Sequence, residues 1–224
     1  MEWDASSIRA QRSGWRAYAR AQFNSSPWAV EAAESMEEAV TQLYGALSGL
    51  RLQGLRDADY YTGLVTSFLR TQLSVIDAIR DSEVIDGTTL LRKQLEATAR
   101  LRELDTVPAD KLKKRTPNIS ALKTGVKGLY GSYSEIAHSS TRRHFELLGT
   151  DESGDGWTSL FPKFSSNSYV LLQNAAMVFL EFWIWLEAFV DANALPVGES
   201  WNVAKTEVGI LISCLLNDGD ESPV

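Results

Sequence analysis

Three charged residues near the middle of the chain are spaced so that they share one side of a helix. Arg92, Glu96 and Arg100 follow each other at intervals of four, and residues four apart are neighbours on a helix surface. The face that they form lies roughly opposite the leucines of the same segment. Intrahelical ion pairs on a solvated face would explain the spacing, and so would a face that turns toward a second polar helix and holds an anionic ligand or a phosphate.

A second polar series has the same spacing. Tyr130, Ser134 and His138 follow at intervals of four and border an apolar face made by Leu129, Tyr133, Ile136 and Ala137. A histidine at such a border is either a partly buried structural residue or part of a site. Ser134 and His138 have the residue types of a nucleophile and its base, but no Gly-x-Ser-x-Gly elbow surrounds Ser134.

Basic residues gather directly after His138. Arg142, Arg143 and His144 bring both histidines of the chain and two arginines into seven residues. This group would suit a phosphate or RNA, and it would equally suit the end of a helix, where cations are favourable. Both interpretations stay open at the level of sequence.

Four arginines form a stripe close to the start of the chain, at positions 9, 12, 16 and 20. Three explanations fit an amphipathic helix with such a stripe: a solvated face, a surface for nucleic acid or a partner protein, and a face that lies on an anionic membrane. The whole chain has a net charge of −7, which argues against a general nucleic-acid coat because phosphate binding depends on Lys and Arg.

Glu181 stands out because Phe179, Leu180, Phe182 and Trp183 surround it in sequence. A carboxylate in such a segment is expected to be at least half buried, and a buried charge needs a partner. The candidate partners are Arg92, Arg100 and His138. Such a network would either be purely structural or form the floor of a pocket.

Several kinds of site are not indicated. The two histidines do not share a helix face, and no metal-binding motif or Gly-rich phosphate loop is visible, so we expect no metal and no cofactor. Cys214 is the only cysteine, which favours a reducing compartment, and we predict the cytoplasm. No apolar stretch of a secretory signal follows Met1. Residues 169–190 are apolar but include Glu181 and Glu187, so we expect a buried helix rather than a membrane span.

The sequence pattern predicts that all segments that carry these residues are helices. The six prolines fall at the edges of segments with helical periodicity. We predict an all-α fold, an antiparallel bundle of about seven helices, in a single domain over residues 1–217. The predicted helices cover residues 5–23 (within an amphipathic N-terminal segment 1–23), 27–52, 60–80, 88–105, 118–146, 166–192 and 200–216. Long loops are expected at 106–117 and 149–163, and an acidic tail at 218–224.

Two short motifs resemble a known pattern. One is Leu90-Leu91-Arg92-x-x-x-Glu96, and the other is Tyr130-x-x-x-Ser134-x-x-x-His138. The pair resembles uncharacterised bacterial helical families, some of them distantly similar to HEPN domains, which are common in RNA-cutting toxins and phage-defence proteins. The resemblance covers roughly residues 60–190. It implies that Arg92, Glu96, Tyr133, Ser134 and His138 converge between helices. HEPN ribonucleases carry an Arg four to six residues before the His, and neither His138 nor His144 has one.

Three functional hypotheses follow. The first is a non-enzymatic domain with a polar pocket between helices and a regulatory or interaction role, in line with the stress and defence proteins of the resemblance, as a homodimer. The second is a HEPN-like ribonuclease or another enzyme acting on phosphodiesters through His138. The third is a purely structural network without a ligand. The candidate ligand-binding residues are Arg92, Glu96, Arg100, Tyr133, Ser134, His138, Arg142 and Arg143.

Overall fold

The computed structural model describes residues 5–52, 54–138 and 164–217. This part of the chain holds α-helices and one short 3-10 helix, and it contains no strand. The helices are α1 (Ala5–Phe23), α2 (Pro27–Leu47), α3 (Ala58–Arg80), α4 (Val84–Leu104), α5 (Ala109–Leu112), η1 (Ile119–Ala121), α6 (Lys127–Ala137), α8 (Asn167–Ala192) and α9 (Glu199–Asn217). The predicted all-α fold is confirmed.

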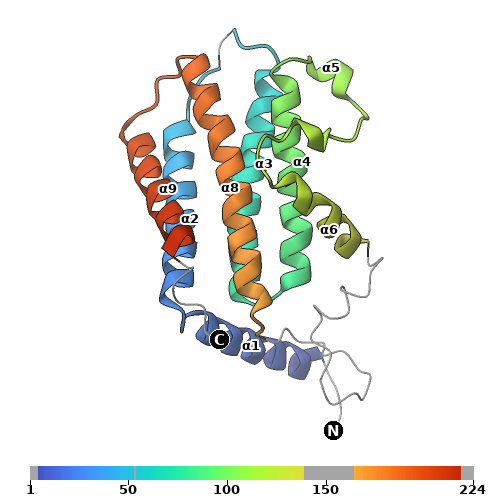
Figure 1. Ribbon diagram of the computed structural model, residues 1–224, viewed down its shortest axis with the longest axis vertical. Helices are drawn as coiled ribbons and strands as arrows, with labels where there is room; N and C mark the ends of the chain where they lie inside the picture. Colours follow the sequence, from blue (N-terminus) through green and yellow to red (C-terminus); the bar gives the residue numbers. More distant parts are fainter. Residues whose placement is uncertain (1–4, 53, 139–163, 218–224) are drawn as a thin grey trace.

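Helices α2, α3, α4, α8 and α9 form the bundle, and α1 lies across one end of it (Figure 1). The apolar helix α8 occupies the centre and contacts α2, α3, α4 and α9. Neighbours in sequence are antiparallel, as in α2 and α3, α3 and α4, or α8 and α9 (Figure 1). However, α4 and α8 run in the same direction, because α5, η1 and α6 lie in the connection between them.

Local sequence explains where the helices begin and end. Pro27 starts α2, where a missing N–H does no harm. After Leu47 the chain reaches Gly49, whose φ of +80° suits glycine and stops the helix. The helix predicted over 27–52 therefore ends five residues early. The loop predicted over 106–117 contains the single turn α5.

The predicted helix over 118–146 is split. Asn118 accepts a hydrogen bond from the backbone N–H of Ser120 and caps the 3-10 helix η1, and α6 begins only at Lys127. An asparagine that bonds its own backbone two residues on favours such a turn over a continuous helix. The last part of this predicted helix, the predicted loop 149–163 and the acidic tail lie outside the described residues.

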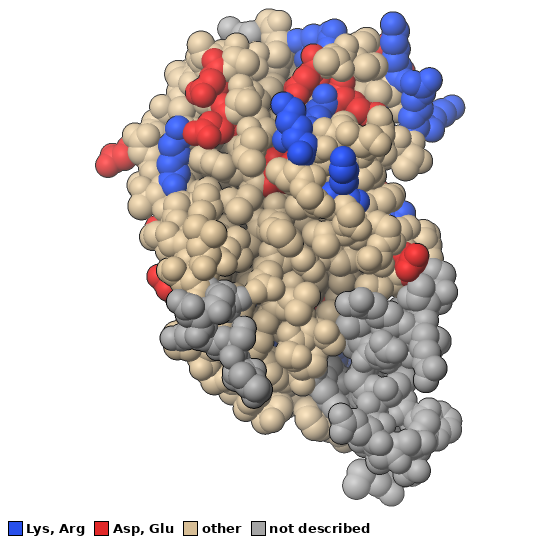
Figure 2. Space-filling view, viewed as in Figure 1, with Lys and Arg blue, Asp and Glu red and all other residues tan. Residues whose placement is uncertain are grey.

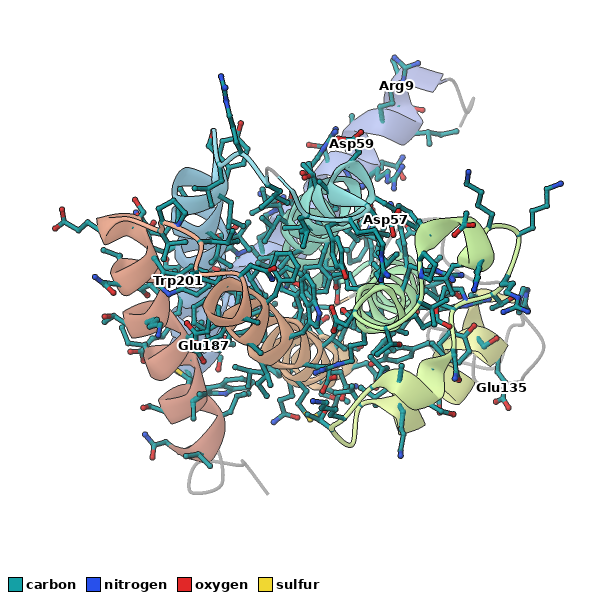
Figure 3. All side chains as sticks on the ribbon, turned by 90° about the horizontal axis from the view of Figure 1, so that it is seen from above. Arg9, Asp57, Asp59, Glu135, Glu187 and Trp201 are labelled. Atoms are coloured by element: carbon teal, nitrogen blue, oxygen red, sulfur yellow. The ribbon has the colours of Figure 1, made fainter. Side chains whose placement is uncertain are left out.

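Stacked aromatic rings connect α8 to its neighbours. Phe182 stacks on Phe68 of α3 with 3.9 Å between ring centroids, and Trp183 stacks on Trp201 of α9 at 5.0 Å. Viewed from above, Trp201 points from α9 toward α8 (Figure 3). Gly87 allows α4 to approach α8, because a Cβ there would lie 2.6 Å from Leu171. Among the described residues, no helix has both the length and the hydrophobicity to cross a membrane.

Candidate functional site

A polar cluster joins α4 to α6. The Arg92 guanidinium donates from Nε to Glu96 Oε1 at 3.1 Å, and its Nη1 lies 3.0 Å from His138 Nε2. The hydroxyl of Tyr130 donates to the same Glu96 oxygen at 3.0 Å, and the guanidinium lies over the Tyr130 ring, 5.5 Å from its centroid. The structure therefore brings together residues from both motifs of the sequence.

The contact between Arg92 and His138 determines which ring nitrogen of His138 accepts a hydrogen bond. A guanidinium can only donate, so Nε2 of His138 is the acceptor in this contact and Nδ1 is the ring nitrogen left to donate. The side chains of Arg92 and Glu96 are 22% and 29% exposed, so solvent reaches the cluster. A held and accessible guanidinium can bind a carboxylate or a phosphate oxygen.

The other predicted residues of α6 have different surroundings. Tyr133 is buried in the core, and Ser134 is half-buried. The backbone carbonyl of Ser134 accepts the N–H of His138. No hydrogen bond in the described part of the chain joins the Ser134 hydroxyl to the His138 ring, so a nucleophile–base pair does not form there. Arg142 and Arg143 lie outside the described residues.

Arg100 does not belong to this cluster. It is only 4% exposed, donates to the backbone carbonyl of Arg115 and pairs with Glu103 at 3.0 Å. The expected solvated face of Arg92, Glu96 and Arg100 is therefore wrong at its last position. Successive residues four apart drift by about 40° around a helix, and this drift carries Arg100 toward the segment after α5.

Glu181 was expected to be at least half buried and is fully buried, but the partners expected for it were wrong. Its carboxylate accepts Arg102 Nε at 2.7 Å and the backbone N–H groups of Lys123 and Thr124 at 3.0 Å each. Burial alone would raise the pKa of Glu181, but these hydrogen bonds and the Arg102 charge outweigh burial and hold the pKa below its ordinary value. The network fixes the segment between η1 and α6.

Three arginines of the α1 stripe form ion pairs with the bundle while their side chains stay 39–49% exposed. Arg12 and Arg16 both bind Glu83, at 2.8 and 2.9 Å, and Arg20 binds Asp81. Burial would raise the pKa of Glu83, but the bonds from the two arginines outweigh it and lower the pKa. Three of the four arginines of the stripe are therefore neutralised by acidic residues of the bundle, which leaves a stripe less basic than its sequence indicates. Arg9 points away from the bundle (Figure 3).

Sequence reasoning missed two further polar groups. The side-chain amide of Gln94 in α4 donates to Gln72 Oε1 in α3 at 2.7 Å, with both residues buried. Asp105 accepts the Tyr61 hydroxyl at 3.3 Å and the Trp185 indole at 3.2 Å, and burial raises the pKa of Asp105. Glutamine in the apolar stripe of a helix was the available signal for the first pair.

Charged side chains are unevenly spread on the face centred on α8. They gather toward the end where α4 and α8 finish, and the middle of this face carries none (Figure 2). Within the described residues, no group of histidine, cysteine and acidic side chains could hold a metal ion.

Comparison of the sequence with protein-family models finds no match. Comparisons with curated proteins and with solved structures find no significant match either.

Proposed function

We propose that the chain is a non-enzymatic helical domain that binds a phosphate-bearing ligand between α4 and α6 and so has a regulatory or interaction role. One observation carries this proposal. Arg92 is held by Glu96, His138 and the ring of Tyr130 while part of its side chain stays in contact with solvent. A guanidinium fixed in this way loses little freedom when it binds an anion.

The geometry favours binding over catalysis. A general base needs a free lone pair within reach of the proton that it takes. The Nε2 lone pair of His138 accepts the N–H of Arg92, and the other ring nitrogen then carries the proton. His138 is therefore set up to donate from Nδ1, which suits a second hydrogen bond to an anionic oxygen.

Substitutions of the cluster test the proposal. The probes are inorganic phosphate, followed by NMR shifts, and a 5′-phosphorylated RNA decamer, followed by fluorescence polarisation. Arg92→Gln should weaken binding at least about tenfold, because a charge-assisted bond is lost. Glu96→Gln should strengthen binding, because it removes the competing carboxylate. Arg9→Gln, an exposed arginine outside the cluster, is the matched control. Equal binding by the wild type and Arg92→Gln would exclude the site.

A second candidate function is supported by the same pair of side chains. The arginine that HEPN ribonucleases carry before their histidine is missing from the sequence here, yet Arg92 of α4 lies 3.0 Å from His138. An enzyme acting on phosphodiesters would use this pair. Cleavage of the RNA decamer by the wild type, lost in His138→Ala with the fold intact, would favour the enzyme over the binding domain.

The structural hypothesis makes a different prediction. If the cluster only fixes the position of α6, Glu96→Ala should lower the free energy of unfolding by about 3–5 kcal/mol without any effect on ligands. We expect a smaller loss, because Glu96 is partly exposed and water can replace its contacts.

Self-association and location belong to the proposal as well. We infer a homodimer in the cytoplasm, where the buried thiol of Cys214 would stay reduced. Light scattering on the purified protein measures the mass directly. A monomer at cellular concentration would remove the homodimer from the proposal and leave the α4–α6 site unaffected.

A further inference from the structure

A cavity of about 460 Å³ lies at the end of the bundle where α2 and α8 finish and α3 begins. This volume is in the range of small-molecule sites. Its walls are largely apolar and are formed by Leu47, Val65, Leu69, Leu186, Phe189 and Leu195. The cavity shares no residue with the cluster of Arg92, Glu96, Tyr130 and His138.

The hollow arises because α2 stops before it covers the facing stripe of α3. The chain turns away at Gly49 and continues as a loop until α3 begins at Ala58. The residues of α3 that line the cavity, at positions 62, 65, 66, 69 and 70, have the spacing of one helix face. Along α3 these lining residues include the apolar side chains of Val65 and Leu69, and the last of them is the charged Arg70.

Ring packing and hydrogen bonds hold the aromatic side of the cavity in place. Tyr61 packs on Phe189 at 4.9 Å between ring centroids, and Phe189 stacks on Trp185 at 5.0 Å. Asp105 holds the hydroxyl of Tyr61 and the indole of Trp185 from behind. A wall fixed before the ligand arrives reduces the entropy lost on binding.

Of the described residues that line the cavity, only Arg70 is charged. It is exposed, and in the described part of the chain no carboxylate forms an ion pair or hydrogen bond with its guanidinium, whereas Arg80 on the same helix binds Glu37. An apolar cavity with one uncompensated cation at its edge is complementary to a ligand with an apolar body and a single negative charge.

We propose that this cavity binds an alkyl monocarboxylate, with the chain between α3 and α8 and the carboxylate on Arg70. Octanoate is the probe, measured by calorimetry on the full chain, with hexanoate and octanol as comparisons. Octanoate should bind about tenfold more tightly than hexanoate, because two more methylene groups are buried. Octanol should bind at least about tenfold more weakly than octanoate, because it lacks the charge.

Variants at three lining positions test where the ligand lies. Val65→Trp should fill the cavity and abolish binding, and Thr66→Trp at the exposed mouth serves if the first does not fold. Arg70→Gln should weaken octanoate at least about tenfold and leave octanol unchanged, while Arg9→Gln should change neither. Absence of octanoate binding, or binding unaffected by the tryptophan variants, would overturn the proposal. Equal loss of octanoate and octanol in Arg70→Gln would also overturn the assignment of the carboxylate. None of these results bears on the α4–α6 site.

Discussion

Glu181 is a buried carboxylate that connects three segments distant in sequence. Its oxygens accept Arg102 from α4 and the backbone N–H groups of Lys123 and Thr124. Arg102 and Glu181 are 7% and 0% exposed, so neither charge can turn to water if the other is removed. Removing one partner of a buried ion pair destabilises the fold, because the other charge stays buried without a partner. This holds even where an apolar pair of the same size would give equal stability.

Glu181→Ala should therefore lower the free energy of unfolding by about 3–5 kcal/mol, because it leaves Arg102 and two N–H groups without their acceptor. Urea unfolding measures the loss. Glu187→Ala on the same helix is the control, because Glu187 pairs with Lys205 and the two side chains are 38% and 44% exposed, respectively. This variant should lose less than about 1 kcal/mol of unfolding free energy. Similar losses in the two variants would show that burial of Glu181 does not matter.

The lowered pKa of Glu181 gives a second prediction. Because its folded-state pKa lies below the unfolded value, the unfolded chain takes up the proton first as the pH falls. The stabilisation from Glu181 is complete above the unfolded pKa, about 4.3, and is lost as the pH falls through the folded pKa. The stability difference between wild type and Glu181→Gln should then shrink below about pH 4. Urea unfolding at a series of pH values measures it, and a constant difference would contradict the assignment.

At the scale of elements, ion pairs hold the middle of α1 against the bundle, and the buried side chain of Phe23 holds its end. Glu83 accepts both Arg12 and Arg16, and it lies directly before α4. Glu83→Lys should loosen α1 by about 2 kcal/mol, from two lost pairs of up to about 1 kcal/mol each. Hydrogen exchange of the α1 amides measures this opening.

Restoring the charge pattern provides the control for that prediction. Arg16→Glu combined with Glu83→Lys should recover part of the protection, because an ion pair forms again in the opposite sense. Arg9→Glu, which reverses an exposed charge on the same helix, should leave the exchange rates unchanged. Loss of protection in Arg9→Glu would mean that helix propensity or net charge, rather than the pairs with Glu83, holds α1.

The sequence predicted most helices because their apolar periodicity and the prolines agree. Residues 5–23 and 166–192 show this best, since α1 and α8 match them to within one residue. The segment after Asn118 was harder, because a side chain that caps a 3-10 turn competes with helix in a way that periodicity does not reveal. Helix ends depended on single residues such as Gly49.

The candidate site was less predictable than the helices. The spacing of Arg92 and Glu96 indicates a shared face, and this is a property of one helix. The choice of Arg102 rather than Arg92 or Arg100 as the partner of Glu181 depends on how α4 and α8 are rotated and shifted against each other. A single sequence does not show how two helices are rotated and shifted against each other. It therefore could not show which of Arg92, Arg100 and Arg102 reaches Glu181.

At the scale of the whole molecule, one apolar cluster runs from Phe23 at the end of α1 to Cys214 in α9. It includes fully buried residues of α2, α3, α4, α8 and α9. Elements that share one continuous core lose their packing together when any of them unfolds. The position of α9 at the side of the bundle (Figure 1) makes it the element on which this cooperativity can best be tested.

We expect one unfolding transition for the whole chain. Leu95→Ala in α4 and Leu211→Ala in α9 remove side chains with no exposed surface, and each should cost about 2–5 kcal/mol. In urea, tryptophan fluorescence and far-ultraviolet circular dichroism should shift together in both variants. Leu216→Ala, also in α9 but 77% exposed, should change the midpoint little. If Leu211→Ala produced an early transition with only part of the helical signal, α9 would be a separate unit and the single core would be wrong.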